Sequence, residues 1–161
     1  MESRPLELIR LLNLQPHPEG GHYRQIYRSE SQVLRGIDGV ERRALTTIYF
    51  LLTAGSCSRW HKVLADEVWH HYEGAALELL SFPPDGANLV SHRLGPLAQG
   101  SSPVHVVPAG WWQAARPLGA YALVGCTVAP GFEFEDFTLL ADLPEIDRAI
   151  PPNFAEFSQF L

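Results

Sequence analysis

Short segments rich in β-branched and aromatic residues, each bounded by turn residues, recur along most of this chain. The longest is 42–53 (RRALTTIYFLLT), whose composition predicts a buried strand. The pair Asp38-Gly39 predicts a tight hairpin turn, and the run at 83–86 (PPDG) predicts a turn after which the chain pairs back. The other expected strands are 22–30, 67–72, 75–82, 87–94, 104–107, 112–115 and 121–129. Because these strands do not alternate with helices, the pattern predicts an all-β sandwich or barrel and argues against a parallel α/β sheet.

Helices are expected near the two ends of the chain. Residues 4–14 carry a broad apolar face at helical spacing, with Ser3 as the N-cap. The Pro- and Gly-containing run that follows (PHPEGG) is expected to end this helix. Two further segments, 143–150 and 153–160, are also predicted to be helical.

The length of the chain and the lack of any repeat or linker predict one domain over residues 1–161, with the barrel at about 22–141. The 18 acidic and 12 scattered basic residues give a net charge of -6, which argues against nucleic acid as a partner. No apolar run approaches the roughly 20 residues of a membrane-spanning helix, and the N-terminus lacks a signal-peptide pattern. Although a disulfide stays open, Cys57 and Cys126 are interpreted as reduced thiols, so the expected location is cytoplasmic.

Two separated motifs narrow the range of possible folds. Residues 55–74 fit the pattern G-x5-H-x-V-x3-E-x6-G through His61, Val63 and Glu67, and residues 107–113 read VPAGWWQ. Together they resemble the two motifs of the cupin superfamily, G-x5-H-x-H-x3-E-x6-G and G-x5-P-x-G-x2-H-x3-N. The histidine, glutamate and glycines of the first motif match without gaps, and both motifs lie on or beside predicted strands in the right order.

Four runs resemble one branch of bacterial and fungal cupins, the fifth cupin family. They are HPEGGHYRQIYRS (17–29), DEVWHHYEG (66–74), VPAGWWQAA (107–115) and GCTVAPGFEFEDF (125–137). The resemblance implies a double-stranded β-helix, the cupin jelly roll, with short N- and C-terminal helices, and it points to no single reaction. It also implies a homodimer, in agreement with the sheet edges that such a fold must cover and with a strand at 22–30 that precedes the barrel motifs.

The general cupin motif implies a metal held by two histidines and a glutamate of the first motif and one histidine of the second. Here Val63 and Gln113 occupy two of the histidine positions, so His61 and Glu67 alone remain. Two such ligands and a carboxamide make a poor zinc or iron site, so no cofactor is expected. If a divalent metal does bind, the expected ligands are His61, Glu67 and Gln113 together with waters.

Without a metal, His61 and Glu67 are an imidazole and a carboxylate on neighbouring strands, and we predict that they form a catalytic acid/base pair. The alternative is that the two side chains hydrogen-bond each other and satisfy a polar core. If they are in contact, we expect the carboxylate to keep the imidazole protonated. A cationic imidazole would favour an anionic or polyhydroxylated ligand.

Further candidate ligand-binding residues come from the same strands. Trp69 and His71 should point the same way as Glu67, because side chains alternate along a strand, although His71 is more simply a residue near solvent. Gln113 adds a carboxamide to the wall of the pocket. Tyr49, on the long predicted strand, is a candidate acid.

The run HPEGG is expected to form either a lid over the barrel mouth or a simple turn whose glycines adopt unusual backbone angles. As a lid it would bring Glu19 and Tyr23 into the pocket, and Tyr23 is a second candidate acid. His17 has no partner at an informative spacing and is interpreted as a surface or core residue.

Three functions are compatible with a pocket of this kind for a small-molecule ligand. The first is a metal-independent enzyme of the isomerase or epimerase kind acting on a sugar-like or anionic small molecule. The second is a non-catalytic ligand-binding or sensor protein. The third is a metal-dependent oxygenase or decarboxylase with a reduced ligand set. The sequence leaves open whether the protein is an enzyme.

Overall fold

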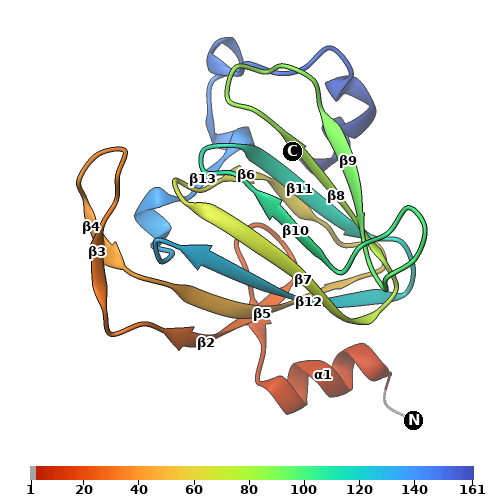
Figure 1. Cartoon of the computed structure of the whole chain (residues 1–161). Coiled ribbons are helices and arrows are strands. Elements are labelled where there is room, and N and C mark those ends of the chain that lie inside the picture. Colours follow the sequence, from red (N-terminus) through yellow and green to blue (C-terminus); the bar gives the residue numbers. More distant parts are fainter. Residues whose placement is uncertain (1–2) are drawn as a thin grey trace.

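Two antiparallel sheets face each other in the computed structural model of the chain, which describes residues 3–161 (Figure 1). The larger sheet has the strand order β1-β2-β5-β12-β7-β10, and the smaller sheet has the order β13-β6-β11-β8-β9. Apart from the pairs β1–β2 and β8–β9, neighbours in these sheets are not consecutive along the chain, as in a jelly roll, and the all-β prediction is confirmed. The bounds are α1 Arg4–Leu12, β1 Gln15–Pro16, β2 His22–Arg28, β3 Gln32–Leu34, β4 Glu41–Arg43, β5 Thr46–Thr53, β6 Ser58–Lys62, β7 Asp66–Gly74, β8 Leu77–Phe82, β9 Val90–Leu94, β10 Val104–Val107, β11 Trp112–Pro117, β12 Tyr121–Ala129 and β13 Thr138–Leu139.

Side chains from both sheets fill the barrel interior. On β5, Phe50 and Leu52 point inward and pack in one cluster with Leu79 of β8, and all three are at most 1% exposed. Leu51 lies between them and points to the opposite face, where it packs with Leu8 of α1. Alternation along β5 therefore places the core on one face of the larger sheet and the N-terminal helix on the other (Figure 1).

The C-terminal segment is helical, but its helices are of the 3₁₀ type. The segments predicted at 143–150 and 153–160 contain η3 at Glu145–Asp147 and η4 at Phe154–Phe160. Two further 3₁₀ turns precede them, η1 at Phe134–Asp136 and η2 at Leu140–Asp142. Phe154, Phe157 and Phe160 recur at every third position, and all three pack in the cluster around Trp60. A spacing of three matches the 3₁₀ period, so burial of these rings favours the tighter helix.

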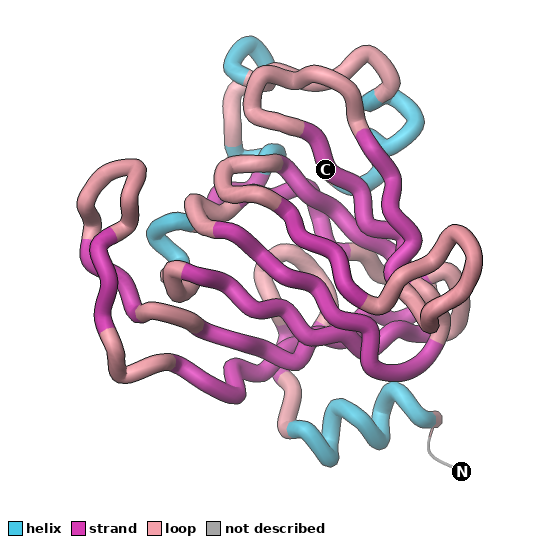
Figure 2. Tube along the Cα trace, viewed as in Figure 1, coloured by secondary structure: helices cyan, strands magenta, loops and turns pink. Residues whose placement is uncertain are grey.

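The strand predicted at 42–53 is interrupted between β4 and β5. Around the interruption, Ala44 N–H donates to the Ser31 carbonyl (2.9 Å) and Ser29 N–H donates to the Leu45 carbonyl (2.9 Å). The pairs β2–β5 and β3–β4 are therefore linked into one ribbon that bends at this point. The β3–β4 hairpin projects from the barrel (Figures 1 and 2).

Strand β6 was not among the predicted strands. Its sequence, SRWHK, is short and mostly polar, so composition alone does not indicate a strand. In the structure β6 pairs with both β11 and β13, and the register places His61 opposite Gln113. Tertiary pairing therefore places the two motif residues on adjacent strands.

Within residues 3–161, no helix is both long enough and apolar enough to span a membrane. Cys57 and Cys126 are free thiols, so they are not joined in a disulfide.

Candidate functional site

A cavity of about 390 Å³ lies within the barrel and is lined by residues of both sheets. Four buried ionisable residues of this lining, called the floor below, are Glu19, His61, Glu67 and Cys126, each at most 7% exposed. The largely apolar walls include Tyr23, Ile48, Val63, Val128 and Phe132. The exposed or half-buried rim, called the mouth, includes Arg24, Gln25, Arg28, Glu133 and Phe134.

Glu19 reaches the floor from the loop between β1 and β2. Gly20 has a φ of +111°, and a Cβ at this position would lie 2.0 Å from the Cys57 carbonyl oxygen, so only glycine allows the loop to approach β6 this closely. The Glu19 carbonyl accepts a hydrogen bond from Arg59 N–H (2.7 Å), and its Oε1 accepts one from the Ser58 hydroxyl (2.9 Å). The loop therefore packs on β6 and directs a carboxyl group inward.

The hydrogen bonds of His61 identify its neutral tautomer. Nδ1 lies 2.7 Å from the Arg59 carbonyl oxygen, which can only accept, so Nδ1 carries the proton. The other nitrogen, Nε2, lies 3.1 Å from Glu19 Oε2. A second proton must lie between these two atoms, either on the acid of Glu19 or on the imidazole. The carboxyl in contact with His61 is thus Glu19, whereas the sequence pointed to Glu67.

Glu67 is held by a directed chain of donors. The Trp69 indole N–H can only donate, and it donates to Gln113 Oε1 (2.9 Å). The Gln113 amide nitrogen then donates to Glu67 Oε2 (2.6 Å). The Cys126 thiol also hydrogen-bonds this carboxyl group. Gln113 and Trp69 thus orient Glu67 from behind, and neither residue lines the cavity.

Burial dominates the protonation of the floor. It raises the pKa of Glu19 to about 8, and the hydrogen bond from Ser58 offsets only part of this rise. It raises the pKa of Glu67 to about 7, opposed by the charge of His61 and reinforced by that of Glu19. The pKa of His61 is lowered, because burial outweighs the attraction of Glu67. A protonated His61 was expected on condition that the imidazole contacts Glu67, but Nε2 contacts Glu19 instead, and burial favours a neutral imidazole beside a protonated Glu19.

His17 also lines the cavity, although no role was predicted for it. Its Nδ1 accepts a hydrogen bond from the Glu19 backbone N–H (3.1 Å), and its ring meets Tyr23 edge-on at 4.5 Å. Burial lowers its pKa to about 3, so the ring is neutral at physiological pH. The only signal in the sequence was its position as the first residue of the HPEGG run.

The remaining candidate residues lie in three different places. Tyr23 lines the cavity wall, as the lid hypothesis expects. Tyr49 packs against the cluster beneath α1 and meets Tyr72 at 6.1 Å, so it is directed to the outer face of the sheet. His71 bonds through Nε2 to the Ala75 carbonyl (3.0 Å) and does not line the cavity.

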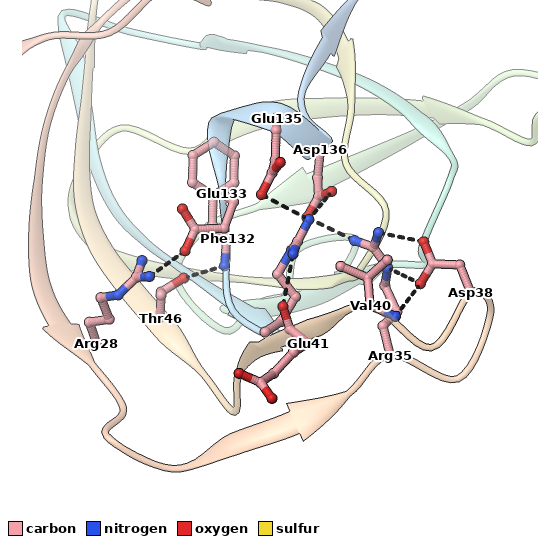
Figure 3. A network of polar contacts seen from close by, with 11 residues as sticks. Arg28, Arg35, Asp38, Val40, Glu41, Thr46, Phe132, Glu133, Glu135 and Asp136 are labelled. Carbon is pink, nitrogen blue, oxygen red and sulfur yellow. Dashed lines mark hydrogen bonds and ion pairs between the residues drawn. The ribbon is translucent and has the colours of Figure 1, made fainter.

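A polar network ties the segment after β12 to the rest of the mouth (Figure 3). Thr46 Oγ1 accepts a hydrogen bond from Phe132 N–H (2.9 Å). Asp136 accepts two from Arg42 (2.7 and 2.8 Å) and pairs with Arg35 at 2.8 Å. The hydrogen bonds from Arg42 lower the pKa of Asp136 most, and Arg35 lowers it further, so this carboxylate stays charged. The projecting hairpin therefore anchors one side of the mouth.

Comparison with known proteins assigns the family. Residues 6–140 match the family model described as Cupin superfamily (DUF985). The chain belongs to this cupin family. The cupin fold inferred from the two motifs is therefore confirmed, and so is the narrower branch.

Relatives of this cupin occur in bacteria and eukaryotes. Protein SO0799 from Shewanella oneidensis is 36% identical with a TM-score of 0.76, covering 87% of this chain and 85% of that chain. A hypothetical protein from Leishmania major is 32% identical with a TM-score of 0.78, covering 83% of this chain and 85% of that chain. The uncharacterized protein YML079W from Saccharomyces cerevisiae is 29% identical over 180 residues, which are 100% of this chain and 89% of that protein.

The floor of this cupin does not fit the metal site that the general cupin motif implies. Val63 presents hydrocarbon to the cavity at one histidine position. At another, the oxygen of Gln113 is engaged by Trp69 and its nitrogen faces Glu67, so Gln113 directs no oxygen at the cavity. Across residues 3–161, no three His, Cys, Asp or Glu side chains are placed to hold one ion. The donor set therefore disagrees with the general motif, and the chemistry below uses protein groups alone.

Proposed function

We propose that this cupin binds a small organic molecule in its cavity and moves a proton on it, as a metal-independent isomerase or epimerase does. The observation that carries the proposal is the contact between His61 Nε2 and Glu19 Oε2 at 3.1 Å, on the floor of a cavity large enough for such a ligand. Burial of two acids beside an imidazole brings their pKa values toward neutrality, where acid/base catalysis is most efficient.

The two carboxyl groups take different roles in the proposed reaction. Glu67, with a pKa near 7, is the base that removes a proton from a carbon next to a carbonyl group. The pair formed by Glu19 and His61 carries the shared proton and donates it to the carbonyl oxygen, which gives an enol. Glu67 then returns its proton to the carbon, on the same face or, if the enol turns over in the cavity, on the opposite face, while the enol O–H returns its proton to the pair of Glu19 and His61. Both steps together regenerate the carbonyl and the starting protonation state. These reaction steps require no oxidant and no group from outside the protein and its ligand.

The hydrogen bonds that hold the floor residues in place also support this assignment. Glu67 is oriented by Gln113 and Cys126, and His61 by the Arg59 carbonyl, so the reacting groups are fixed before a ligand enters. Such preorganisation reduces the reorganisation needed during proton transfer. It also serves a non-catalytic binding protein, which is the alternative that the experiment must separate.

The test is solvent deuterium exchange into a panel of chiral hydroxy ketones, aldoses and keto acids, followed by NMR in D₂O. We expect wild-type protein to introduce deuterium at the carbon next to the carbonyl of at least one compound. Glu67→Gln should lower this rate by about 100-fold or more, since general acid/base groups contribute roughly 10²–10⁴-fold. His61→Asn should also lower it. The exposed Glu30→Gln serves as the control and should keep the wild-type rate.

Binding without exchange in the wild type would identify a binding or sensor protein instead. Exchange that survives Glu67→Gln and His61→Asn unchanged would show that the floor is not the reactive site.

A further inference from the structure

A β-bulge in β2 determines which side chains of that strand enter the cavity. The register shifts between Gln25 and Tyr27, so Ile26 is an extra residue without a partner on β5. In a regular strand Tyr27 would share the face of Gln25, because side chains alternate. After the bulge it is Arg28 that lies opposite the cavity-lining Thr46. A bulge re-aims a side chain in this way, and here it turns a guanidinium group toward the cavity.

Arg28 forms an ion pair with Glu133 across the mouth (Figure 3). The two side chains are 40% and 33% exposed, and an ion pair this open to water contributes little to stability. A second cation at the mouth, Arg24, donates to the Leu12 carbonyl (3.3 Å). An anionic oxygen group on a ligand can therefore replace Glu133 as the partner of Arg28 at small cost, and it gains a charge-assisted hydrogen bond.

The floor and walls determine the orientation of such a ligand. The floor holds Glu19, which is protonated, and Glu67, which is partly ionised near neutral pH; neither offers a positive charge to an anion, and both suit a hydroxyl or carbonyl group. Ile48, Val63 and Val128 offer hydrocarbon between the floor and the mouth, which suits a short carbon chain. A cavity of about 390 Å³ is near the lower end of the range for organic ligands, roughly 300–1,000 Å³.

We infer that the ligand is a small organic anion, held at the mouth by Arg28 through its charged oxygens, with a hydroxyl or carbonyl carbon at the floor. The inference rests on the proposed function in naming the floor as the reacting end. The shared chemistry is an anionic oxygen group, which a carboxylate or a phosphate monoester can supply. Glu133 keeps Arg28 paired until the ligand enters.

The experiment measures dissociation constants by NMR titration, with the His61 ring signals as the readout of cavity binding. The carboxylate arm uses lactate, levulinate and mandelate, each compared with its neutral amide. The phosphate arm uses glycerol phosphate compared with glycerol. We expect at least one anion to bind wild-type protein more tightly than its neutral counterpart, by about tenfold or more, the effect of one hydrogen bond to a charged group. The arm that binds identifies the source of the charge.

Three variants test the role of Arg28. Arg28→Gln should remove the difference between the anion and its neutral counterpart, whereas Arg24→Gln, at the same mouth, should preserve it. Glu133→Gln should tighten anion binding, because Arg28 is then free of its competitor. The inference is overturned if no anion of either arm binds better than its neutral counterpart, or if Arg28→Gln leaves the anion affinity unchanged. Binding is measured without turnover, so failure of the proton-transfer function leaves this result unaffected.

Discussion

At the scale of single residues, Glu19 governs the chemistry of the cavity floor. It lies 3.1 Å from His61 Nε2, and burial raises its pKa to about 8. An acid that stays protonated at neutral pH can donate to a neutral imidazole, whereas an ionised one would leave an uncompensated charge in the barrel. The pair therefore carries one proton through the physiological pH range, and that proton is the one available to a ligand.

The first prediction concerns stability as a function of pH. The pKa of Glu19 is raised from 4.5 to about 8 in the folded state, so its stabilising contribution is complete below pH 4.5 and is lost as the pH rises through 8. Glu19→Gln keeps a neutral donor to His61 and cannot ionise. As the pH rises through this window, the free energy of unfolding of the variant should therefore increase relative to that of wild type, by up to about 1.4 kcal/mol per pH unit.

Urea denaturation at a series of pH values measures this difference, and the exposed Glu30→Gln is the control. Parallel stability curves for Glu19→Gln and wild type between these pH values would show that Glu19 ionises as freely in the folded protein as in the unfolded chain.

At the scale of elements, the close approach of the β1–β2 loop to β6 determines whether Glu19 reaches the floor. The loop passes so near to Cys57 that a Cβ on Gly20 would overlap its carbonyl oxygen at 2.0 Å. Cys57 directly precedes β6, which is paired with β11 from Ser58 onward, and this pairing restrains the carbonyl from moving aside. The position of the carboxyl group is therefore a property of loop packing and not of the cupin motif.

The second prediction tests this packing with two glycine variants. Gly20→Ala should lower the free energy of unfolding by about 2–5 kcal/mol, since it combines backbone strain with a steric clash. Gly39→Ala is the matched control: its φ is +71°, but nothing lies within 4 Å of the added Cβ, so the loss should be about 1–2 kcal/mol. Urea denaturation measures both. Equal losses in the two variants would refute the close approach of the loop.

At the scale of the whole molecule, the larger sheet exposes an edge at β2. Strand β5 pairs with β2 on one side. On the other side, β1 pairs only with His22 and Tyr23, and in the described chain no strand covers this side of β2 from Arg24 onward. Exposed apolar side chains include Ile26 and Tyr27 on β2, at 42% and 55% exposure, and Leu34 and Ile37 on the β3–β4 hairpin, at 71% and 79%. An open edge flanked by apolar residues favours pairing with another chain.

The third prediction is that the protein forms a homodimer through the β2 edge and the β3–β4 hairpin. Sedimentation velocity at micromolar concentration should give a dimer for wild type, and the double variant Ile26→Lys, Leu34→Lys should shift it to a monomer. Leu6→Lys, on the exposed face of α1 (56% exposed), is the control and should leave the dimer intact. A wild-type monomer under these conditions would contradict the prediction.

The sequence alone determined the architecture and two members of the floor. The resemblance to the two cupin motifs implied the barrel and singled out His61 and Glu67, because those positions are separated by fixed numbers of residues within one local pattern, although the strand that carries His61 was not predicted. The short helix at the N-terminus followed from its apolar periodicity for the same reason.

Only the tertiary structure decided which groups act together. Glu19 joins His61 through loop packing across 42 positions of sequence, and His17 and Cys126 also enter the cavity from segments distant in sequence from His61. Arg28 faces the mouth because one extra residue in β2 reverses the alternation that a sequence pattern assumes. Contacts of this kind depend on where distant backbone segments meet and on single-residue shifts of register, and neither leaves a periodic signal in the sequence.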